Sequence, residues 1–492
     1  MKKTLIILSA ICLLFNNSIN TKAQIINNSV VTEVNTTTDD TNKSNATDDK
    51  NNKDLWPANS PNVHSEAAIV MEASTGAILY SKNIHQTYYP ASITKILTAL
   101  LAIENSSLGE TITFSKEAIF DVDLDSSRIG IDVGEQLTME QSLYGIMLES
   151  ANEVSYAIAE HVSGNVESFA KLMNEKAKEL GCTDSNFVNP HGLPDPNHYT
   201  SAYDMALISR AAINNDTFRT ITGTRIYTIP PTNIQEETRY LANHHKFVKG
   251  NIKFDGCIGG KTGYTSKALY TLVTFAERNG MTLISVIMKC DSIQNEYSDT
   301  ASILNFAFDN FSIYNISDIV DPKSEESSSL FTKYSPLFNR ETSKLQVSPK
   351  GNIVLPNGVD YKDAKKEIEL TPISEVKDGE NIIGSIQYTY GGKYVGSADI
   401  IYNNITSPTL LKGAYIPTPI ATPEIDNTDS ASVFHSDSKS LKPLIIGIMV
   451  GVVILGTLIY IVLIEIPYRK KRNAYRQKRD RRKRTDKIKI NF

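Results

Sequence analysis

Three short groups of residues in this sequence have the types and the order that acyl transfer needs. They are Ser92-x-x-Lys95, Ser150-x-Asn152 and Lys261-Thr262-Gly263. A serine hydroxyl attacks a carbonyl only when a base takes its proton, and a lysine can be this base where burial or other cations lower its pKa. Because residues three apart lie on the same face of a helix, Lys95 could activate Ser92 if this segment is helical.

The segment around Ser92 is predicted to begin a helix. Pro90 is typical of a first helical turn. Apolar residues then recur with helical spacing at Ile93, Ile96, Leu97, Leu100 and Leu101. We therefore expect Ser92 at a helix N-terminus, where free backbone N–H groups could stabilise the negative oxygen of a tetrahedral intermediate.

Each motif alone is weak evidence, because similar patterns recur by chance in this chain. Ser374-x-x-Lys377 and Ser436-x-x-Lys439 match the first pattern, and Ser163-x-Asn165 matches the second. The order of the three groups, on a predicted helix, in a helical lobe and on a strand, carries more weight. This order is found in penicillin-binding proteins and class A β-lactamases.

The residues around the motifs narrow the resemblance to one family. The stretches 89–98 (YPASITKILT), 147–152 (MLESAN), 187–193 (FVNPHGL) and 260–265 (GKTGYT) are similar to those of the D-alanyl-D-alanine carboxypeptidases, the low-molecular-weight penicillin-binding proteins. The resemblance runs over residues 66–311 and continues less sharply into the β-rich segment that follows. It implies an α/β (α+β) transpeptidase fold of the penicillin-binding and β-lactamase type, with a helical lobe.

The resemblance also implies a role for each catalytic candidate. Ser92 would attack the carbonyl between two D-alanines and form an acyl-enzyme, with Lys95 as its base. Ser150 would relay a proton toward the leaving amine. Asn152 would orient Lys95 and the substrate amide.

The third group would bind the substrate. Lys261 would present positive charge and Thr262 a hydroxyl to the terminal carboxylate, while Gly263 would let the substrate backbone lie against the strand. The N–H groups of Ser92 and Tyr264 would form the oxyanion hole. The expected substrate is a peptidoglycan stem peptide, and β-lactam antibiotics are expected to acylate the serine. Neither a metal, nor an organic cofactor, nor a nucleic acid is implied.

Four positions need a separate interpretation. Glu153 stands where the family commonly has Asp, and Leu269 falls where a Gly is usual. We interpret His191 as a structural loop residue, since a Ser-Lys mechanism needs no histidine. We interpret Cys257 as a packing residue rather than a second nucleophile.

The elements that must hold these groups follow from periodicity. Residues 138–180 are strongly helical, Lys261 is expected to open a strand, and a helix at 298–311 is expected to close the domain. Strand-like composition occurs at residues 67–72, 76–82, 268–275 and 283–289. Because such segments flank the helices, we expect one sheet made from both ends of the catalytic segment.

Two apolar runs predict export and a membrane tether. Residues 1–23 have the basic, apolar and small-residue regions of a signal peptide. Residues 444–464 form an uncharged run of the length that spans a bilayer, and the basic residues that follow it predict a cytoplasmic tail. The predicted segments are a signal peptide (1–23), a disordered linker (24–61), the catalytic domain (62–313), an all-β domain (314–412), a disordered stalk (413–443), a transmembrane helix (444–464) and a basic tail (465–492).

Composition and motifs weigh against other functions. The chain has four cysteines, no Cys-x-x-Cys and no His-Glu-x-x-His motif, which argues against a zinc peptidase. A β-lactamase would need a deacylating carboxylate, typically in a Glu-x-x-Leu-Asn element, and residues 153–260 contain no such element. An endopeptidase acting on peptidoglycan cross-links would use the same active site and stays open. A catalytically idle wall sensor is a further alternative, although every reactive residue is present.

Overall fold

The computed structural model describes residues 56–319, 345–371 and 377–404. The predicted signal peptide and the predicted stalk, transmembrane helix and tail lie outside these ranges, as does nearly all of the predicted linker. Among the helices of the described ranges, none has both the length and the apolar character needed to cross a bilayer.

Five antiparallel strands form the central sheet. They are β1 (Ala67–Glu72), β2 (Ile78–Lys82), β7 (Cys257–Thr265), β8 (Leu269–Arg278) and β9 (Met281–Cys290). Their order is β2-β1-β9-β8-β7, so the N-terminal hairpin pairs with strands from the far end of the catalytic segment. The expectation of one sheet made from both ends is confirmed. Strand β7 lies at an edge.

Local sequence explains how the hairpin between β8 and β9 closes. Asn279 and Gly280 connect the two strands, with φ of 51° and 75°. A two-residue turn with positive φ at both positions matches the twist of the flanking strands, and Asn-Gly is the pair that tolerates it best.

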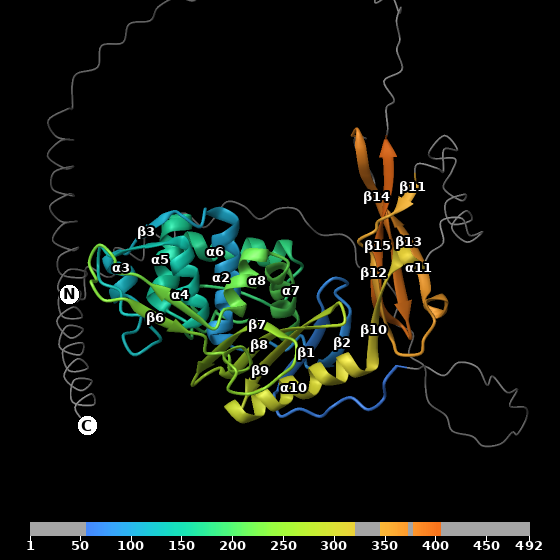
Figure 1. The fold of residues 1–492 in the computed structure, drawn as a ribbon, viewed down its shortest axis with the longest axis horizontal. Helices are drawn as coiled ribbons and strands as arrows, with labels where there is room; N and C mark the ends of the chain where they lie inside the picture. Colours follow the sequence, from blue (N-terminus) through green and yellow to red (C-terminus); the bar gives the residue numbers. More distant parts are fainter. Residues whose placement is uncertain (1–55, 320–344, 372–376, 405–492) are drawn as a thin grey trace, which may run out of the picture. The chain divides into compact units, whose positions relative to one another are not determined.

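Helices cover both faces of this sheet (Figure 1). The helical elements of the catalytic segment are the 3-10 turn η1 (Ala91–Thr94), α2 (Lys95–Asn105), α3 (Lys116–Phe120), α4 (Met139–Leu148), α5 (Asn152–Ser163), α6 (Val166–Glu179), α7 (Ala202–Ile213), α8 (Asp216–Gly223), α9 (Lys246–Lys249) and α10 (Ile293–Asn310). Two small two-stranded sheets pair β3 (Thr111–Thr113) with β4 (Gln136–Thr138), and β5 (Ile226–Ile229) with β6 (Arg239–Ala242). Helix α10 lies on one face, and α2, α7 and α8 lie on the other.

Strand residues alternate between two cores because successive side chains point to opposite faces. Ile69 and Met71 pack into the core shared with the helical lobe, whereas Ala68 and Val70 pack into the core under α10. All four are essentially inaccessible to solvent. The sheet is therefore buried on both sides, which fixes the register of its strands.

Helix boundaries in the lobe follow their capping residues. Thr138 accepts from the backbone N–H of Gln141, and the Gln141 side chain accepts from the Thr138 N–H, so α4 begins with a capping box. Gly164 ends α5 in the left-handed conformation. Ser292 caps α10, which begins five residues earlier than predicted.

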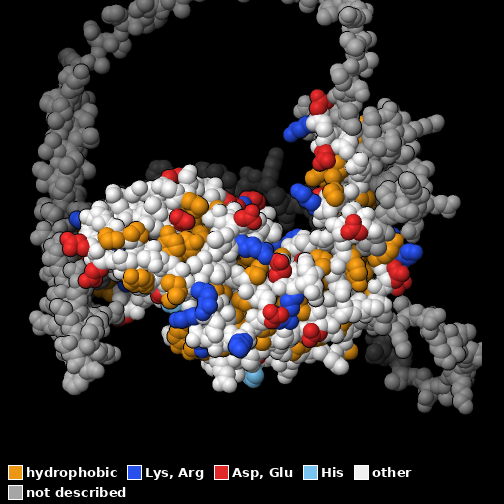
Figure 2. Space-filling model, in the orientation of Figure 1, with side chains coloured by type: hydrophobic (Ala, Val, Ile, Leu, Met, Phe, Trp, Pro, Cys, Tyr) orange, Lys and Arg blue, Asp and Glu red, His pale blue; other side chains and the backbone are white. Residues whose placement is uncertain are grey.

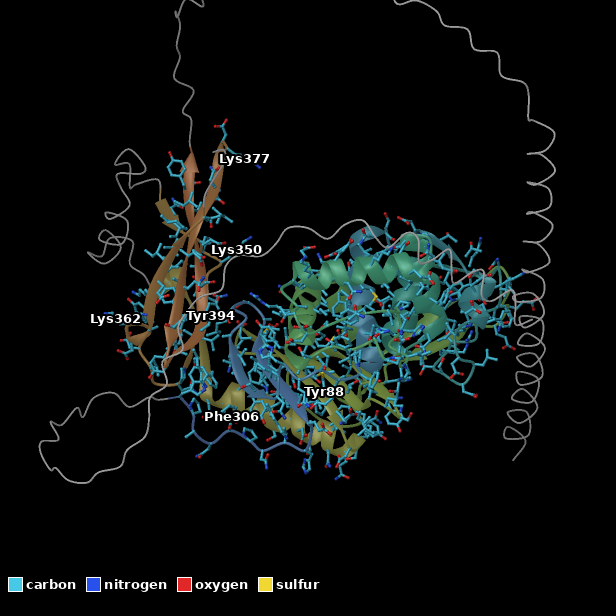
Figure 3. All side chains as sticks on the ribbon, turned by 180° about the vertical axis from the view of Figure 1, so that it is seen from behind. Tyr88, Phe306, Lys350, Lys362, Lys377 and Tyr394 are labelled. Atoms are coloured by element: carbon cyan, nitrogen blue, oxygen red, sulfur yellow. The ribbon has the colours of Figure 1, made fainter. Side chains whose placement is uncertain are left out.

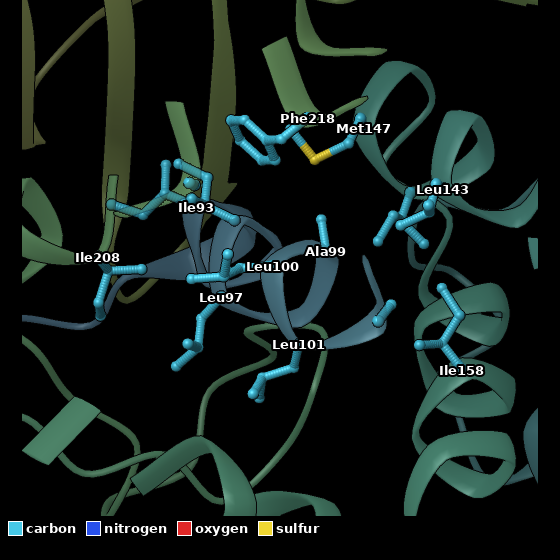
Figure 4. Packing of buried hydrophobic residues seen from close by; sticks show 14 of the residues in the cluster. Ile93, Leu97, Ala99, Leu100, Leu101, Leu143, Met147, Ile158, Ile208 and Phe218 are labelled. Carbon is cyan, nitrogen blue, oxygen red and sulfur yellow. The ribbon is translucent and has the colours of Figure 1, made fainter. Parts of the chain in front are cut away.

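Helix α2 lies in the middle of the helical lobe (Figure 4). Ile93, Leu97 and Leu100, which the sequence placed on one apolar face, are fully buried among residues of the neighbouring helices. Ala99 and Thr98 are buried as well, so the helix is enclosed on several sides. This packing holds the first turn of α2, and the serine before it, in a fixed position.

A second antiparallel sheet follows α10. Its strands are β10 (Phe311–Asn315), β11 (Leu345–Val347), β12 (Asn352–Pro356), β13 (Lys365–Leu370), β14 (Gly379–Tyr390) and β15 (Lys393–Asn404). Phe306 of α10 contacts Phe311 at the start of β10 with ring centroids 6.1 Å apart. Lys350, Lys362 and Lys377 belong to this second part of the chain (Figure 3).

Candidate active site

Ser92 lies in η1, immediately before α2. The sequence predicted it at a helix N-terminus; the structure places it one turn earlier, in a 3-10 turn that leads directly into the helix. Ala91 adopts a φ of 51°, a conformation that costs an alanine about 1 kcal/mol. Thr271 of β8 donates to the Pro90 carbonyl at 2.9 Å, which ties this turn to the sheet.

Lys95 is the first residue of α2 and is completely buried. Its Nζ lies 3.0 Å from Ser92 Oγ, 2.6 Å from Asn152 Oδ1 and 2.6 Å from the carbonyl oxygen of His191. The asparagine and the carbonyl hold the lysine nitrogen against the serine hydroxyl. The predicted grouping of Ser92, Lys95 and Asn152 is therefore present in the structure.

The pKa of Lys95 is lowered well below its ordinary value. Burial disfavours its charged form, the nearby Lys261 charge does so further, and Glu153 opposes both. A neutral lysine nitrogen has a lone pair that can accept a proton. This nitrogen lies within hydrogen-bonding distance of the Ser92 hydroxyl, the geometry that a general base requires.

Ser150 and Lys261 form the second half of the site. Lys261 Nζ lies 3.1 Å from Ser150 Oγ and donates to the Thr262 carbonyl at 2.9 Å. Burial lowers the pKa of Lys261 to about 7, against an opposing effect of Glu149. Ser150 has a φ of 59° and lies just before α5. The Lys261 amine, which contacts the Ser150 hydroxyl, therefore changes its charge near neutral pH.

Strand β7 brings the third motif against the nucleophile. Lys261 was expected to open a strand; it instead lies in the middle of β7, because Cys257, Gly259 and Gly260 already pair with β8. A Cβ on Gly263 would come within 2.9 Å of the Ser92 backbone nitrogen and 2.4 Å of Thr271 Oγ1. Only glycine allows this approach.

These elements surround a cleft of about 290 Å³. Tyr264 is 56% exposed at its edge, and its ring lies 4.6 Å from that of Tyr270. Sequence reasoning missed several residues that line this cleft, namely Ser127, His244, Lys246, Tyr270, Ile293, Glu296 and Tyr297. Most lie outside the recognised motifs, and a local pattern does not show that their segments meet. The His191 carbonyl was missed because backbone atoms leave no signal in side-chain types.

The positions that depart from the family pattern lie around the cleft rather than in it. Glu153 is buried and accepts from the N–H groups of Ile129 and Gly130; burial raises its pKa. Leu269 has a φ of 56°, a strained conformation that a glycine would adopt freely. Burial raises the pKa of the Cys257 thiol to about 11, so this thiol is a poor nucleophile at neutral pH.

A family model described as D-alanyl-D-alanine carboxypeptidase matches residues 55–292. The chain is 31% identical over 308 residues to D-alanyl-D-alanine carboxypeptidase DacF of Bacillus subtilis, covering 62% of this chain and 76% of that protein. The chain belongs to the D-alanyl-D-alanine carboxypeptidase family. The resemblance predicted from the motifs is confirmed.

Other D-alanyl-D-alanine carboxypeptidases are similar over the same region. DacA of Haemophilus influenzae is 29% identical, covering 69% of this chain and 84% of that protein. Penicillin-binding protein 5 of the same organism has a solved structure that matches with a TM-score of 0.55 and 26% identity, covering 71% of this chain and 99% of that one. The penicillin-binding-protein-like α+β fold is thereby established, and every predicted site residue lies within the stretch that the family model matches.

Proposed function

We infer that this protein is a serine D,D-carboxypeptidase that removes the terminal D-alanine from peptidoglycan stem peptides. The observation that carries this inference is the contact of a buried lysine of depressed pKa, Lys95, with the Ser92 hydroxyl. Because the family consists of D-alanyl-D-alanine carboxypeptidases, the bond that such a pair would cleave is the one between two D-alanines.

Acylation follows from this geometry. Ser92 Oγ attacks the carbonyl carbon between the two D-alanines while Lys95 Nζ takes the hydroxyl proton. The carbonyl π electrons move to oxygen, and the N–H groups of Ser92 and Tyr264 would bind the resulting oxyanion. Neutral Lys95 is required for this step, so it proceeds above the pKa of that lysine.

Collapse of the intermediate expels the terminal D-alanine. The C–N bond breaks, the leaving nitrogen takes the proton that Lys95 received from Ser92, and an ester of Ser92 with the shortened peptide remains; Lys95 is neutral again. Ser150 lies between the Lys261 ammonium and the cleft, so we assign it the proton relay. Attack of water on the ester, with Lys95 again as the base, releases the peptide and restores the serine.

Substrate recognition is assigned to β7. Strand β7 is an edge strand of the described sheet, so an extended peptide can lie beside it as a further strand. The Thr262 hydroxyl and the Lys261 charge would receive the terminal carboxylate. A β-lactam, whose strained amide and carboxylate resemble this substrate, would acylate Ser92 in the same way.

We further propose that the enzyme works outside the cytoplasmic membrane. The signal-peptide-like residues 1–23 and the apolar run 444–464 support export and a C-terminal tether. Residues 314–412 are assigned to a separate β domain between the catalytic domain and this tether. On the face shown in Figure 2, acidic and basic side chains are interspersed.

Release of D-alanine tests the proposed reaction. A pentapeptide ending in D-alanyl-D-alanine should lose one D-alanine per peptide with the wild type and none with Ser92→Ala. The parallel substrate is a cross-linked peptide dimer whose terminal D-alanines have been removed. Cleavage of the dimer in place of the pentapeptide would overturn the carboxypeptidase in favour of an endopeptidase.

A further inference from the structure

A carboxyl group that the mechanism above does not use lies in the wall of the cleft. Glu296 is in the first turn of α10, is 3% exposed, and lines the same cleft as Ser92 and Thr262. Within the described part of the chain, its Oε2 is buried and has no hydrogen-bond partner. An unpaired buried oxygen is costly, and rotation of the Glu296 side chain toward the cleft would let a bound group supply the missing partner.

The neighbours of Glu296 on each adjacent element define its electrostatic environment. The titratable side chains that line the cleft with it are His244, Lys246 of α9, Tyr264 of β7, Tyr270 of β8 and Tyr297 of α10. Lys246 favours the ionised carboxylate, but burial outweighs it and raises the pKa of Glu296 to about 8. His244 is hydrogen-bonded to Glu149 at 3.0 Å.

A neutral carboxylic acid differs from a carboxylate because it can donate a hydrogen bond. Thr262 and Gly263 line the same cleft as Glu296, and they mark the end of the cleft assigned to the C-terminal residue of the peptide. A proton on Glu296 would give that residue a further donor. Loss of the proton would place a negative charge in the same cleft as the terminal carboxylate.

We propose that Glu296 is a specificity-determining residue, which as a neutral acid donates a hydrogen bond to the C-terminal group of the peptide and as an anion repels a terminal carboxylate. The inference rests on the proposed D,D-carboxypeptidase function. It adds a pH-dependent preference between a free C-terminal carboxylate and an uncharged C-terminal group.

The test compares two peptides in wild type and Glu296→Gln. One peptide ends in D-alanyl-D-alanine and the other in D-alanyl-D-alaninamide, and kcat/KM for each is measured from pH 6.5 to 9.5. Because glutamine stays neutral, the kcat/KM of the wild type for the carboxylate peptide should fall about tenfold relative to the variant between pH 7 and 9.5. The same ratio for the amide peptide should change little.

Two further variants separate this role from a structural one. Glu140→Gln, on the exposed start of α4, removes a distant carboxylate and should leave the profile of the wild type unchanged. Lys246→Met keeps Glu296 but removes the neighbouring charge that favours its anion, so the alkaline fall should move to higher pH. This variant keeps the proposal testable if Glu296→Gln does not fold.

Parallel profiles for wild type and Glu296→Gln, or an equal loss at every pH with both peptides, would overturn the proposal. The proposal would also be overturned if the fall of kcat/KM at alkaline pH occurred at the same pH in Lys246→Met as in the wild type. Failure of the underlying function would look different, because wild type would then release no D-alanine from the carboxylate peptide at any pH.

Discussion

The active site contains two buried lysines, Lys95 and Lys261, and the charge of Lys261 acts on Lys95. Burial lowers both pKa values, and the charge of Lys261 lowers that of Lys95 further. The two side chains are therefore coupled, because a charged Lys261 helps to keep Lys95 neutral, and a neutral Lys95 can act as a base.

Replacing Lys261 with Met should move the acidic limb of Ser92 acylation to higher pH. Without the Lys261 charge, Lys95 keeps its proton to a higher pH, and the shift should be up to about one pH unit. The rate of acylation by a fluorescent penicillin, measured from pH 5 to 9, gives the pH at which this acidic limb lies. The exposed Lys171→Met is the matched control, and a limb that stays in place in Lys261→Met would contradict the coupling.

The same substitution should stabilise the folded protein. Between its folded pKa of about 7 and its ordinary value of 10.5, Lys261 binds more protons in the unfolded chain, so stability of the wild type rises with pH across this window. At pH 7, Lys261→Met should be more stable by on the order of a few kcal/mol, and the difference should shrink toward pH 10. Urea unfolding at both pH values measures it; a variant less stable at pH 7 would disagree.

At the scale of single elements, the sequence predicted the main strands of the catalytic segment but not the backbone conformation around Ser92. Strands β1, β8 and β9 lie close to their predicted bounds because their strand-like composition continues over those residues. The 3-10 turn around Ser92 was not predicted, since it depends on the positive φ of Ala91 and on the bond from Thr271 to Pro90. Such constraints come from the packed sheet and leave no periodic signal.

The approach of β7 to the nucleophile gives a prediction for Gly263. In Gly263→Ala, the new methyl group would meet the Ser92 nitrogen and Thr271 Oγ1, so β7 must move away from Ser92. Acylation by penicillin should slow about 100-fold or more, because the oxyanion donors lose their alignment. Gly109→Ala, whose Cβ would meet nothing within 4 Å, should acylate at the rate of the wild type. A rate in Gly263→Ala equal to this control would refute the close approach.

At the scale of the whole molecule, the sheet joins the two ends of the catalytic segment through the pairing of β1 with β9. Composition predicted this arrangement, because strand-like segments flank the helical lobe. Of the residues that line the cleft, the sequence predicted only those in the three motifs and Tyr264. Glu296 and Lys246 reach it because α10 and α9 pack beside β7 and β8, and nothing in the sequence around either residue indicates that contact.

Cooperativity of this sheet is testable at Ile69. The side chain is fully buried in β1, an interior strand of the sheet, so Ile69→Ala should lower the free energy of unfolding by about 2–5 kcal/mol. The temperatures at which circular dichroism and penicillin labelling are lost should fall by the same amount. Ile226→Ala, at a residue that is 67% exposed, should leave both unchanged. Separate transitions for the two probes would show that the site and the sheet unfold independently.

The covalent adduct on Ser92 is the most direct measurement. The full chain is treated with a penicillin, digested, and mapped by mass spectrometry in wild type and in Ser92→Ala, with circular dichroism to confirm that both are folded. We predict one adduct per wild-type chain, on the peptide that contains Ser92, and none in the variant. An adduct on another residue, or a folded wild type that remains unlabelled, would contradict the assignment of Ser92 and Lys95 as nucleophile and base.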